Sequence, residues 1–144
     1  MGDSAKGQSA PGPGRAVCTK DLGDRAEALA LEHLQRQGLV LVRRNFRTPG
    51  RGGGEIDLIM REPDGTLVFV EVRQRASRNR GGAAGSITAH KQRRIVFAAR
   101  HFLHLIRSEP PCRFDVVLVE GDMGADSATP IRWLRAAFDA SATF

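Results

Sequence analysis

The chain has 144 residues, of which 41% are hydrophobic and 26% charged, a balance typical of one soluble globular domain. Its longest apolar runs, such as residues 67–70, are too short to span a bilayer, and residues 1–10 lack the apolar core of a secretory signal, so we expect a cytoplasmic protein without a membrane partner. The net charge of +6 and the pI of about 10.6 favour polyanionic partners, although charge alone does not select nucleic acid.

Residues 1–20 are rich in Gly, Pro, Ser and Ala, which predicts a flexible tail ahead of a single domain of residues 21–144. Apolar spacing predicts a first helix over residues 22–37, with Asp21 as its N-cap and Gly38 at its end. Strand-like runs follow at residues 39–46, 55–60 and 67–73, with a loop at residues 48–54. Pro63-Asp64-Gly65 predicts a hairpin turn between the last two strands.

The second half of the chain begins with a basic, glycine-rich loop over residues 75–85. Ser86 or Thr88 is expected to cap a second helix that runs to about Arg107. A strand over residues 114–119 and a loop over residues 121–130 follow, and residues 131–138 form a final strand or helix. The order α-β-β-β-α-β predicts an α/β fold with a mixed sheet flanked by helices.

The hairpin carries the most informative acids. In one of the two registers that its loop length allows, Asp57 faces Glu71, and in the other the two are offset by one position. Facing residues have Cβ atoms about 4.5–5.5 Å apart. Strand alternation predicts that Ile56, Leu58 and Met60 share one face while Asp57 points to the other.

Two adjacent carboxylates in apolar strands repel each other and lose hydration. A divalent cation such as Mg²⁺ or Mn²⁺ offsets both costs, because it prefers oxygen ligands and accepts water and phosphate in its remaining positions. Arg73 lies two residues beyond Glu71 on the same face, where it could reach a phosphate. The pattern also allows both acids to lie at strand ends and pair with arginines.

Gly54-Glu55-Ile56-Asp57-Leu58-Ile59 and Val68-Phe69-Val70-Glu71-Val72-Arg73 together resemble the YraN-like uncharacterised family, whose members are considered distant relatives of Holliday junction resolvases and PD-(D/E)-x-K nucleases. Further similarities lie at residues 23–34, 44–45, 91 and 113–115. The resemblance covers about residues 21–138. It implies a restriction-endonuclease-like αβββαβ core, a metal-dependent endonuclease acting on branched or structured DNA, and a homodimer.

Specific roles follow from the resemblance. It implies that Asp57 and Glu71 are metal ligands and that Glu27 completes the metal site. Spacing alone favours a solvated helix acid for Glu27, which borders the buried stripe of the first helix. Asp115 is expected to hold an arginine rather than to act in catalysis.

Position 73 departs from the family pattern, in which lysine is usual. Arginine stays protonated and cannot act as a general base. Arg73 can still bind a phosphate and stabilise transition-state charge, so it remains a catalytic candidate together with Asp57 and Glu71. Lys91 could supply a lysine from the second helix, but its spacing gives no reason that it reaches the site. A solvated lysine or a DNA-backbone contact is the simpler interpretation.

Basic residues follow the candidate site along the chain. They are expected to contact backbone phosphates without reading sequence. These predicted nucleic-acid-binding residues are Arg75, Arg78, Arg80, Lys91, Arg93 and Arg94. The glycines at residues 52–54 fit no nucleotide-binding motif, so no nucleotide cofactor is expected.

Three functional hypotheses remain open. The first is a Mg²⁺-dependent DNA endonuclease with Asp57, Glu71 and Arg73 as catalytic residues. The second is a nucleic-acid-binding module without cleavage activity, which arginine at position 73 favours. The third is a protein-interaction scaffold, which would show no salt-dependent affinity for DNA.

Overall fold

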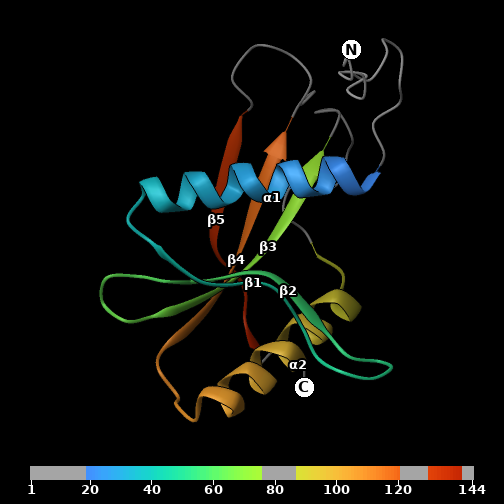
Figure 1. The fold of residues 1–144 in the computed structure, drawn as a ribbon, viewed down its shortest axis with the longest axis vertical. Coiled ribbons are helices and arrows are strands. Elements are labelled where there is room, and N and C mark those ends of the chain that lie inside the picture. The colour runs from blue at the N-terminus through green and yellow to red at the C-terminus, as the bar shows by residue number, and fades with distance from the viewer. Residues whose placement is uncertain (1–18, 76–86, 121–129, 141–144) are drawn as a thin grey trace, which may run out of the picture.

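The computed structural model describes residues 19–75, 87–120 and 130–140. Within them, two helices flank one sheet of five strands in the spatial order β1-β2-β3-β4-β5 (Figure 1). The elements are α1 (Thr19–Arg36), β1 (Val40–Arg47), β2 (Glu55–Arg61), β3 (Leu67–Arg75), α2 (Ala89–Ile106), β4 (Cys112–Glu120) and β5 (Ile131–Phe138). The predicted α/β class and αβββαβ order are confirmed, and the final element is a strand.

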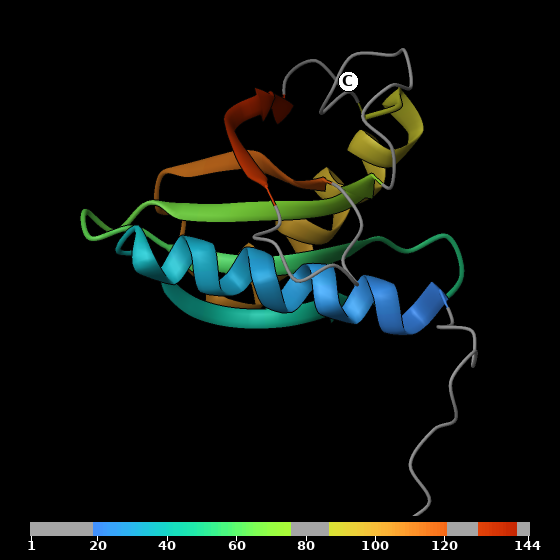
Figure 2. The same ribbon diagram turned by 90° about the horizontal axis from the view of Figure 1, so that it is seen from above.

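The sheet is mixed, as predicted. β3 and β4 run parallel, and each of the other neighbouring pairs is antiparallel. The parallel pair requires a crossover connection, which contains α2. Figure 2 shows α1 on one face of the sheet and α2 on the other. The predicted tail and the predicted loops at residues 75–85 and 121–130 lie almost wholly outside the described residues.

One core lies between α1 and the sheet. The stripe Ala26, Ala30 and Leu34 is buried along the inner side of α1, at the spacing of one helix face. The buried strand residues of this core are Leu58, Met60, Val68, Val70, Val117 and Val119. Burial of each large aliphatic side chain stabilises the fold by about 1.5–3 kcal/mol.

A second core lies between α2 and the sheet. It is more aromatic, with Phe69 stacked on Phe114 at 5.5 Å and edge-on to Phe102 at 6.4 Å between ring centroids. Its other buried residues include Phe46, Ile56, Ile59, Leu67, Ile95 and Ala98. The two cores fix the distance of each helix from the sheet, so side chains of the inner strands β2 and β3 are held in place relative to both helices.

The side-chain alternation of β2 breaks at Asp57. Ile56 belongs to the core under α2, whereas Leu58 and Met60 belong to the core under α1. The prediction that these three residues share one face was therefore wrong for Ile56. Across the strand pair, Asn45 has a left-handed φ of 50°, so both strands depart from regular geometry beside Asp57.

The predicted helix ends are largely confirmed. Gly38 has a φ of 98°, and the Leu39 amide donates to the Leu34 carbonyl at 3.1 Å, as expected for a glycine that ends a helix. Thr88 caps α2, where its hydroxyl accepts from the Lys91 amide at 3.1 Å. The prediction for Asp21 was wrong, because α1 begins at Thr19 and Asp21 lies within its first turn.

Gly54 allows β2 to pass directly against α2. A Cβ placed on Gly54 would overlap the carbonyl oxygen of Arg94 and lie 3.2 Å from the Cβ of Ala98. Arg94 Nε also donates to the Gly53 carbonyl at 3.0 Å. The glycines before β2 therefore serve close backbone packing and fix the position of α2 relative to Asp57.

We expect Gly54→Ala to lower the free energy of unfolding by about 1–3 kcal/mol, because the added methyl forces α2 away from the sheet. Urea denaturation followed by circular dichroism measures this change. Gly23→Ala is the matched control: no atom lies within 4 Å of the new methyl, and alanine favours the α1 helix by about 0.5–1 kcal/mol. Equal destabilisation by both substitutions would contradict the packing role of Gly54.

Candidate functional site

The hairpin register brings the two predicted carboxylates together. Leu58 pairs with Val70 and Met60 with Val68, and continuing this register by one position places Asp57 opposite Glu71. The turn that sets it contains Gly65 at a φ of 95°, as predicted for the Pro-Asp-Gly segment. Of the two registers considered from sequence, the structure adopts the one that the metal hypothesis needs.

The β2–β3 ladder ends at this position. Asp57 Oδ2 accepts a hydrogen bond of 2.8 Å from the backbone amide of Val72. The carboxylate thus bonds an amide of β3 just past the last paired residues, Leu58 and Val70. This bond fixes the Asp57 side chain and leaves its other oxygen for a further partner.

Glu71 is buried, with 8% of its surface exposed. Burial, and next the charge of Asp57, raise its pKa to about 7 from an ordinary 4.5. Burial also raises the pKa of Asp57, although its bond from the Val72 amide opposes the shift. Each carboxylate is thus costly to ionise beside the other in the absence of a compensating cation.

Lys91 reaches this pair from α2. Its Nζ lies 3.6 Å from Oε2 of Glu71, and its side chain is 38% exposed. Sequence reasoning favoured a solvated lysine here, because it could not tell how α2 lies against β3. The Thr88 cap carried the missed signal: it fixes the helix start, and so places Lys91 in the first turn.

Glu27 lies half-buried on α1 at the other side of the pair. Burial, followed by the charge of Asp57, raises its pKa to about 6, while Arg44 and a hydrogen bond with Asn45 oppose the shift. The structure thus places Glu27 within electrostatic reach of Asp57. This position differs from the fully solvated helix acid that spacing alone favoured.

The donor set suits a hard divalent cation held by two carboxylates. In the described part of the chain, no three His, Cys, Asp or Glu side chains form a ready-made metal cluster. Asp57 and Glu71 are therefore the first ligands to consider, with Glu27 set apart from them. Mg²⁺ commonly binds through one or two carboxylates plus water and substrate phosphate. The assignment of all three acids as ligands stays a prediction.

The other predicted site residues that the structure describes lie on β3 and α2. Arg73 is exposed and lies two residues after Glu71 on β3. It pairs with Leu118 of β4. Arg93 and Arg94 are exposed on α2. Arg75 ends β3, and Arg78 and Arg80 lie outside the described residues.

Asp115 has a structural role, as predicted. It is fully buried, and Arg113 holds both its oxygens at 2.9 and 3.0 Å. The Trp133 indole donates to it at 2.8 Å and the Ala136 amide at 2.9 Å. Arg113 also pairs with Glu62. Because these donors satisfy both of its oxygens, Asp115 links β5 to β4 and has a structural role.

The raised pKa of Glu71 predicts a pH-dependent stability. An acid whose pKa rises on folding stabilises the fold below its unfolded pKa, and this contribution is lost as the pH rises through the folded pKa. We therefore expect wild-type protein in EDTA to lose about 2–3 kcal/mol relative to Glu71→Gln between pH 4.5 and about 7. Urea denaturation of both proteins at each pH measures the difference. A difference that stays constant with pH would contradict the buried, destabilised carboxylate.

Neither helix of the described residues is long and apolar enough to cross a bilayer. Among solved structures, one described as "Crystal structure of SSO0001" is 16% identical with a TM-score of 0.37, over 87% of this chain and 56% of that one. A likeness this weak has no bearing on fold or function.

Comparison with known sequences gives much closer matches. The model of a family described as "Uncharacterised protein family UPF0102" matches residues 26–119. A UPF0102 protein of Albidiferax ferrireducens is 63% identical over 122 residues, 85% of this chain and 90% of that relative. One of Paracidovorax citrulli is 59% identical over 141 residues, 97% of this chain and 99% of that relative. These matches confirm the YraN-like resemblance, and the chain therefore belongs to the uncharacterised family UPF0102.

Proposed function

We propose that this protein is a metal-dependent DNA endonuclease whose site is the Asp57–Glu71 pair with Lys91. One observation carries the proposal: two neighbouring carboxylates, both with raised pKa, meet where β2 and β3 separate, and an ammonium group lies 3.6 Å from one of them. Perturbed acids grouped with a cation are more typical of functional sites than of structural ones. Asp115, with its full set of donors, shows what a structural acid looks like in the same sheet.

Asp57 and Glu71 would hold the cation, which is Mg²⁺ or Mn²⁺ in this proposal. Both carboxylates are fixed by the hairpin, and Asp57 is further fixed by the Val72 amide. A divalent cation bound there would polarise the scissile phosphate and lower the pKa of an attacking water. Burial disfavours the charged form of both acids. A divalent cation therefore stabilises the site most when both carboxylates are deprotonated and their charges are uncompensated.

The remaining residues act on the phosphate and on water. Lys91 and Arg73 would contact the anionic phosphate oxygens, where positive charge stabilises the additional charge of the transition state. Arg73 does this only as a permanent cation. Glu27, half-buried and with a pKa of about 6, would position a water molecule on the α1 side of the pair and accept a proton from it.

DNA is the proposed substrate because the chain carries a net charge of +6 and its basic residues flank the carboxylates in sequence. Preference for branched or structured DNA, and cleavage by a homodimer with two symmetric sites, follow from the resemblance to resolvase-like nucleases.

A second candidate function is a nucleic-acid-binding module on a nuclease-like fold. Two observations favour it: arginine replaces the usual lysine at position 73, and no third ligand completes a metal cluster among the described residues. A binding module would keep salt-sensitive DNA affinity without Asp57 or Glu71. The enzyme would need both Asp57 and Glu71 to cleave DNA.

Cleavage of labelled DNA tests the proposal. Four-way-junction, flap, duplex and single-stranded substrates are incubated with the protein in Mg²⁺ or Mn²⁺, with EDTA and identically purified Asp57→Asn protein as controls. We expect cutting that requires the cation and Asp57, and the preferred substrate then identifies the DNA structure. DNA binding without cutting of any substrate would reject the enzyme in favour of the binding module.

A further inference from the structure

Apart from the carboxylates, the most unusual element is α2 itself. This helix of 18 residues contains Lys91, Arg93, Arg94 and Arg100 and has no Asp or Glu. Exposed helix surfaces usually mix both signs of charge, because neighbouring cations repel one another. A helix with cations alone is therefore suited to an anionic partner.

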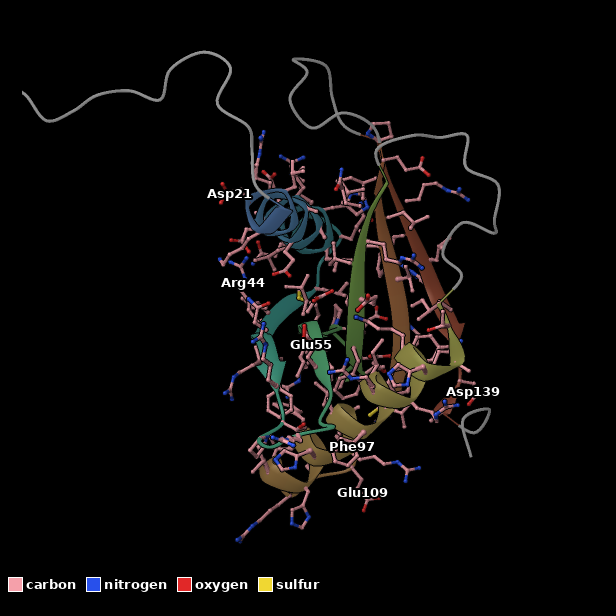
Figure 3. All side chains as sticks on the ribbon, turned by 90° about the vertical axis from the view of Figure 1, so that its right-hand side faces the viewer. Asp21, Arg44, Glu55, Phe97, Glu109 and Asp139 are labelled. Carbon is pink, nitrogen blue, oxygen red and sulfur yellow. The ribbon has the colours of Figure 1, made fainter. Side chains whose placement is uncertain are left out.

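Several exposed residues form a stripe along one side of α2. Arg93, Phe97, Arg100 and His104 follow one another at intervals of four and three residues, so they share that side of the helix, and Arg107 follows at its end as the C-cap residue. All five are exposed, and Phe97 lies on the side of α2 that faces away from α1 (Figure 3). We call these five residues the α2 stripe.

The far end of the α2 stripe lines a surface groove. Arg100, His104 and Arg107 line it together with Ser108, and its volume is about 880 Å³. Glu109 contributes the one acid of its lining. The guanidinium groups and the Ser108 hydroxyl are donors suited to phosphate oxygens.

The length of the α2 stripe fits a segment of nucleic-acid backbone. With a rise of 1.5 Å per residue, Arg93 and Arg107 are about 21 Å apart along the helix. That distance equals about six base pairs of duplex DNA at 3.4 Å each. Three arginines at this spacing can neutralise up to three phosphates.

The α2 stripe is separate from the carboxylate site. Lys91 and Arg93 are two positions apart, which places their side chains on opposite sides of the helix, and Lys91 contacts Glu71 of the sheet. A DNA segment on the stripe is therefore not the segment that lies at Asp57 and Glu71.

We infer that the α2 stripe is a second nucleic-acid-binding surface, which contacts the backbone phosphates of a DNA segment away from the carboxylate pair. This inference rests on the part of the proposed function that concerns DNA binding, and not on cleavage. Two exposed apolar residues of α2, Phe97 of the stripe at 53% and Leu105 at 57%, raise a second copy of the chain as another occupant. Charge argues against it, because two acid-free helices would repel each other.

Binding of a labelled 20-base-pair duplex in EDTA, at KCl concentrations from 50 to 200 mM, tests the inference. We expect Arg100→Gln/Arg107→Gln to reduce the slope of log K against log[KCl] by about two, and to weaken binding about 10-fold or more at the lowest salt. Lys20→Gln/Arg36→Gln is the matched control. It also removes two positive charges, but from α1, on the opposite face of the sheet.

The outcomes separate this inference from the nuclease proposal. A wild-type slope in the α2 double variant would overturn the inference, even if the wild-type protein cuts DNA. A changed mass in sedimentation with an unchanged slope would also overturn it and identify the stripe as a self-association surface. A reduced slope in the α2 variant, with the α1 variant close to wild type, supports the inference even if no substrate is cut.

Discussion

Asp57→Asn and Glu71→Gln are each expected to lower the rate of DNA cleavage at least about 10³-fold at saturating Mg²⁺. Each substitution removes one charged ligand of the proposed cation, whose charge stabilisation is worth several kcal/mol, and 1.36 kcal/mol corresponds to a factor of ten in rate. Both substitutions keep the size of the side chain. The asparagine amide introduced at position 57 retains an oxygen that can accept from the Val72 amide, so the fold should persist.

The distinguishing feature is a loss of activity without a loss of stability. Glu71→Gln should be more stable than wild-type protein in EDTA above pH 7, because it removes a carboxylate that burial makes costly to ionise. Mn²⁺ should largely offset this difference: at 100 times its dissociation constant it stabilises wild-type protein by about 2.7 kcal/mol. The variants, which bind it poorly, should gain little. Thermal unfolding with and without Mn²⁺ measures both effects.

Glu55→Gln provides the control for this prediction. Glu55 lies on the same strand as Asp57, but it is more exposed and pairs with Arg47 across the sheet at 3.8 Å. We expect its cleavage rate to stay within about twofold of wild type, since exposed ion pairs contribute little. Equal losses in all three variants would indicate damage to β2 and not to a metal site. Unchanged cleavage by Asp57→Asn would reject the proposed ligands.

Local patterns predicted most of the fold because each element carries its own signal. The Ala26, Ala30 and Leu34 stripe predicted α1, and Pro63-Asp64-Gly65 predicted the hairpin together with a small set of registers. The choice within that set depends on both cores, which accept Leu58 and Met60 on one side and Ile59 on the other. Tertiary packing makes that choice, and a single strand does not contain it.

The site was predictable only as far as the hairpin extends. Asp57 and Glu71 lie on adjacent strands, so strand pairing alone could bring them together. Glu27 and Lys91 come from helices on opposite faces of the sheet, and their approach depends on how those helices pack. The close passage of Gly54 against α2, which fixes the position of that helix, becomes visible only once the backbone is known. A glycine-rich run indicates a loop, but it does not reveal that one of its glycines packs against a helix.

Lys91→Gln is expected to lower the cleavage rate by about 10²–10³-fold, and Arg73→Gln by about tenfold. The family pattern would favour the opposite order, because position 73 is where the motif lysine usually stands. The structure places Lys91 Nζ at 3.6 Å from Glu71, whereas Arg73 is exposed. A cation close to the reacting phosphate stabilises the transition state by about 2.7–4 kcal/mol. An exposed cation such as Arg73 stabilises it less, because water screens its charge.

Lys91 has a second possible role, because its positive charge lowers the pKa of Glu71. In that case it would help Glu71 to bind the metal without contacting the phosphate. Measurements at saturating Mn²⁺ and above pH 8 separate the two roles. Under these conditions Glu71 is deprotonated and bound to Mn²⁺ both in wild-type protein and in Lys91→Gln. If Lys91 contacts the phosphate, the loss in kcat persists under these conditions and Lys91→Arg restores part of it. If the loss disappears, Lys91 only tunes the metal site and the transition-state charge must come from elsewhere. A larger loss in Arg73→Gln than in Lys91→Gln would return the role of the motif lysine to position 73.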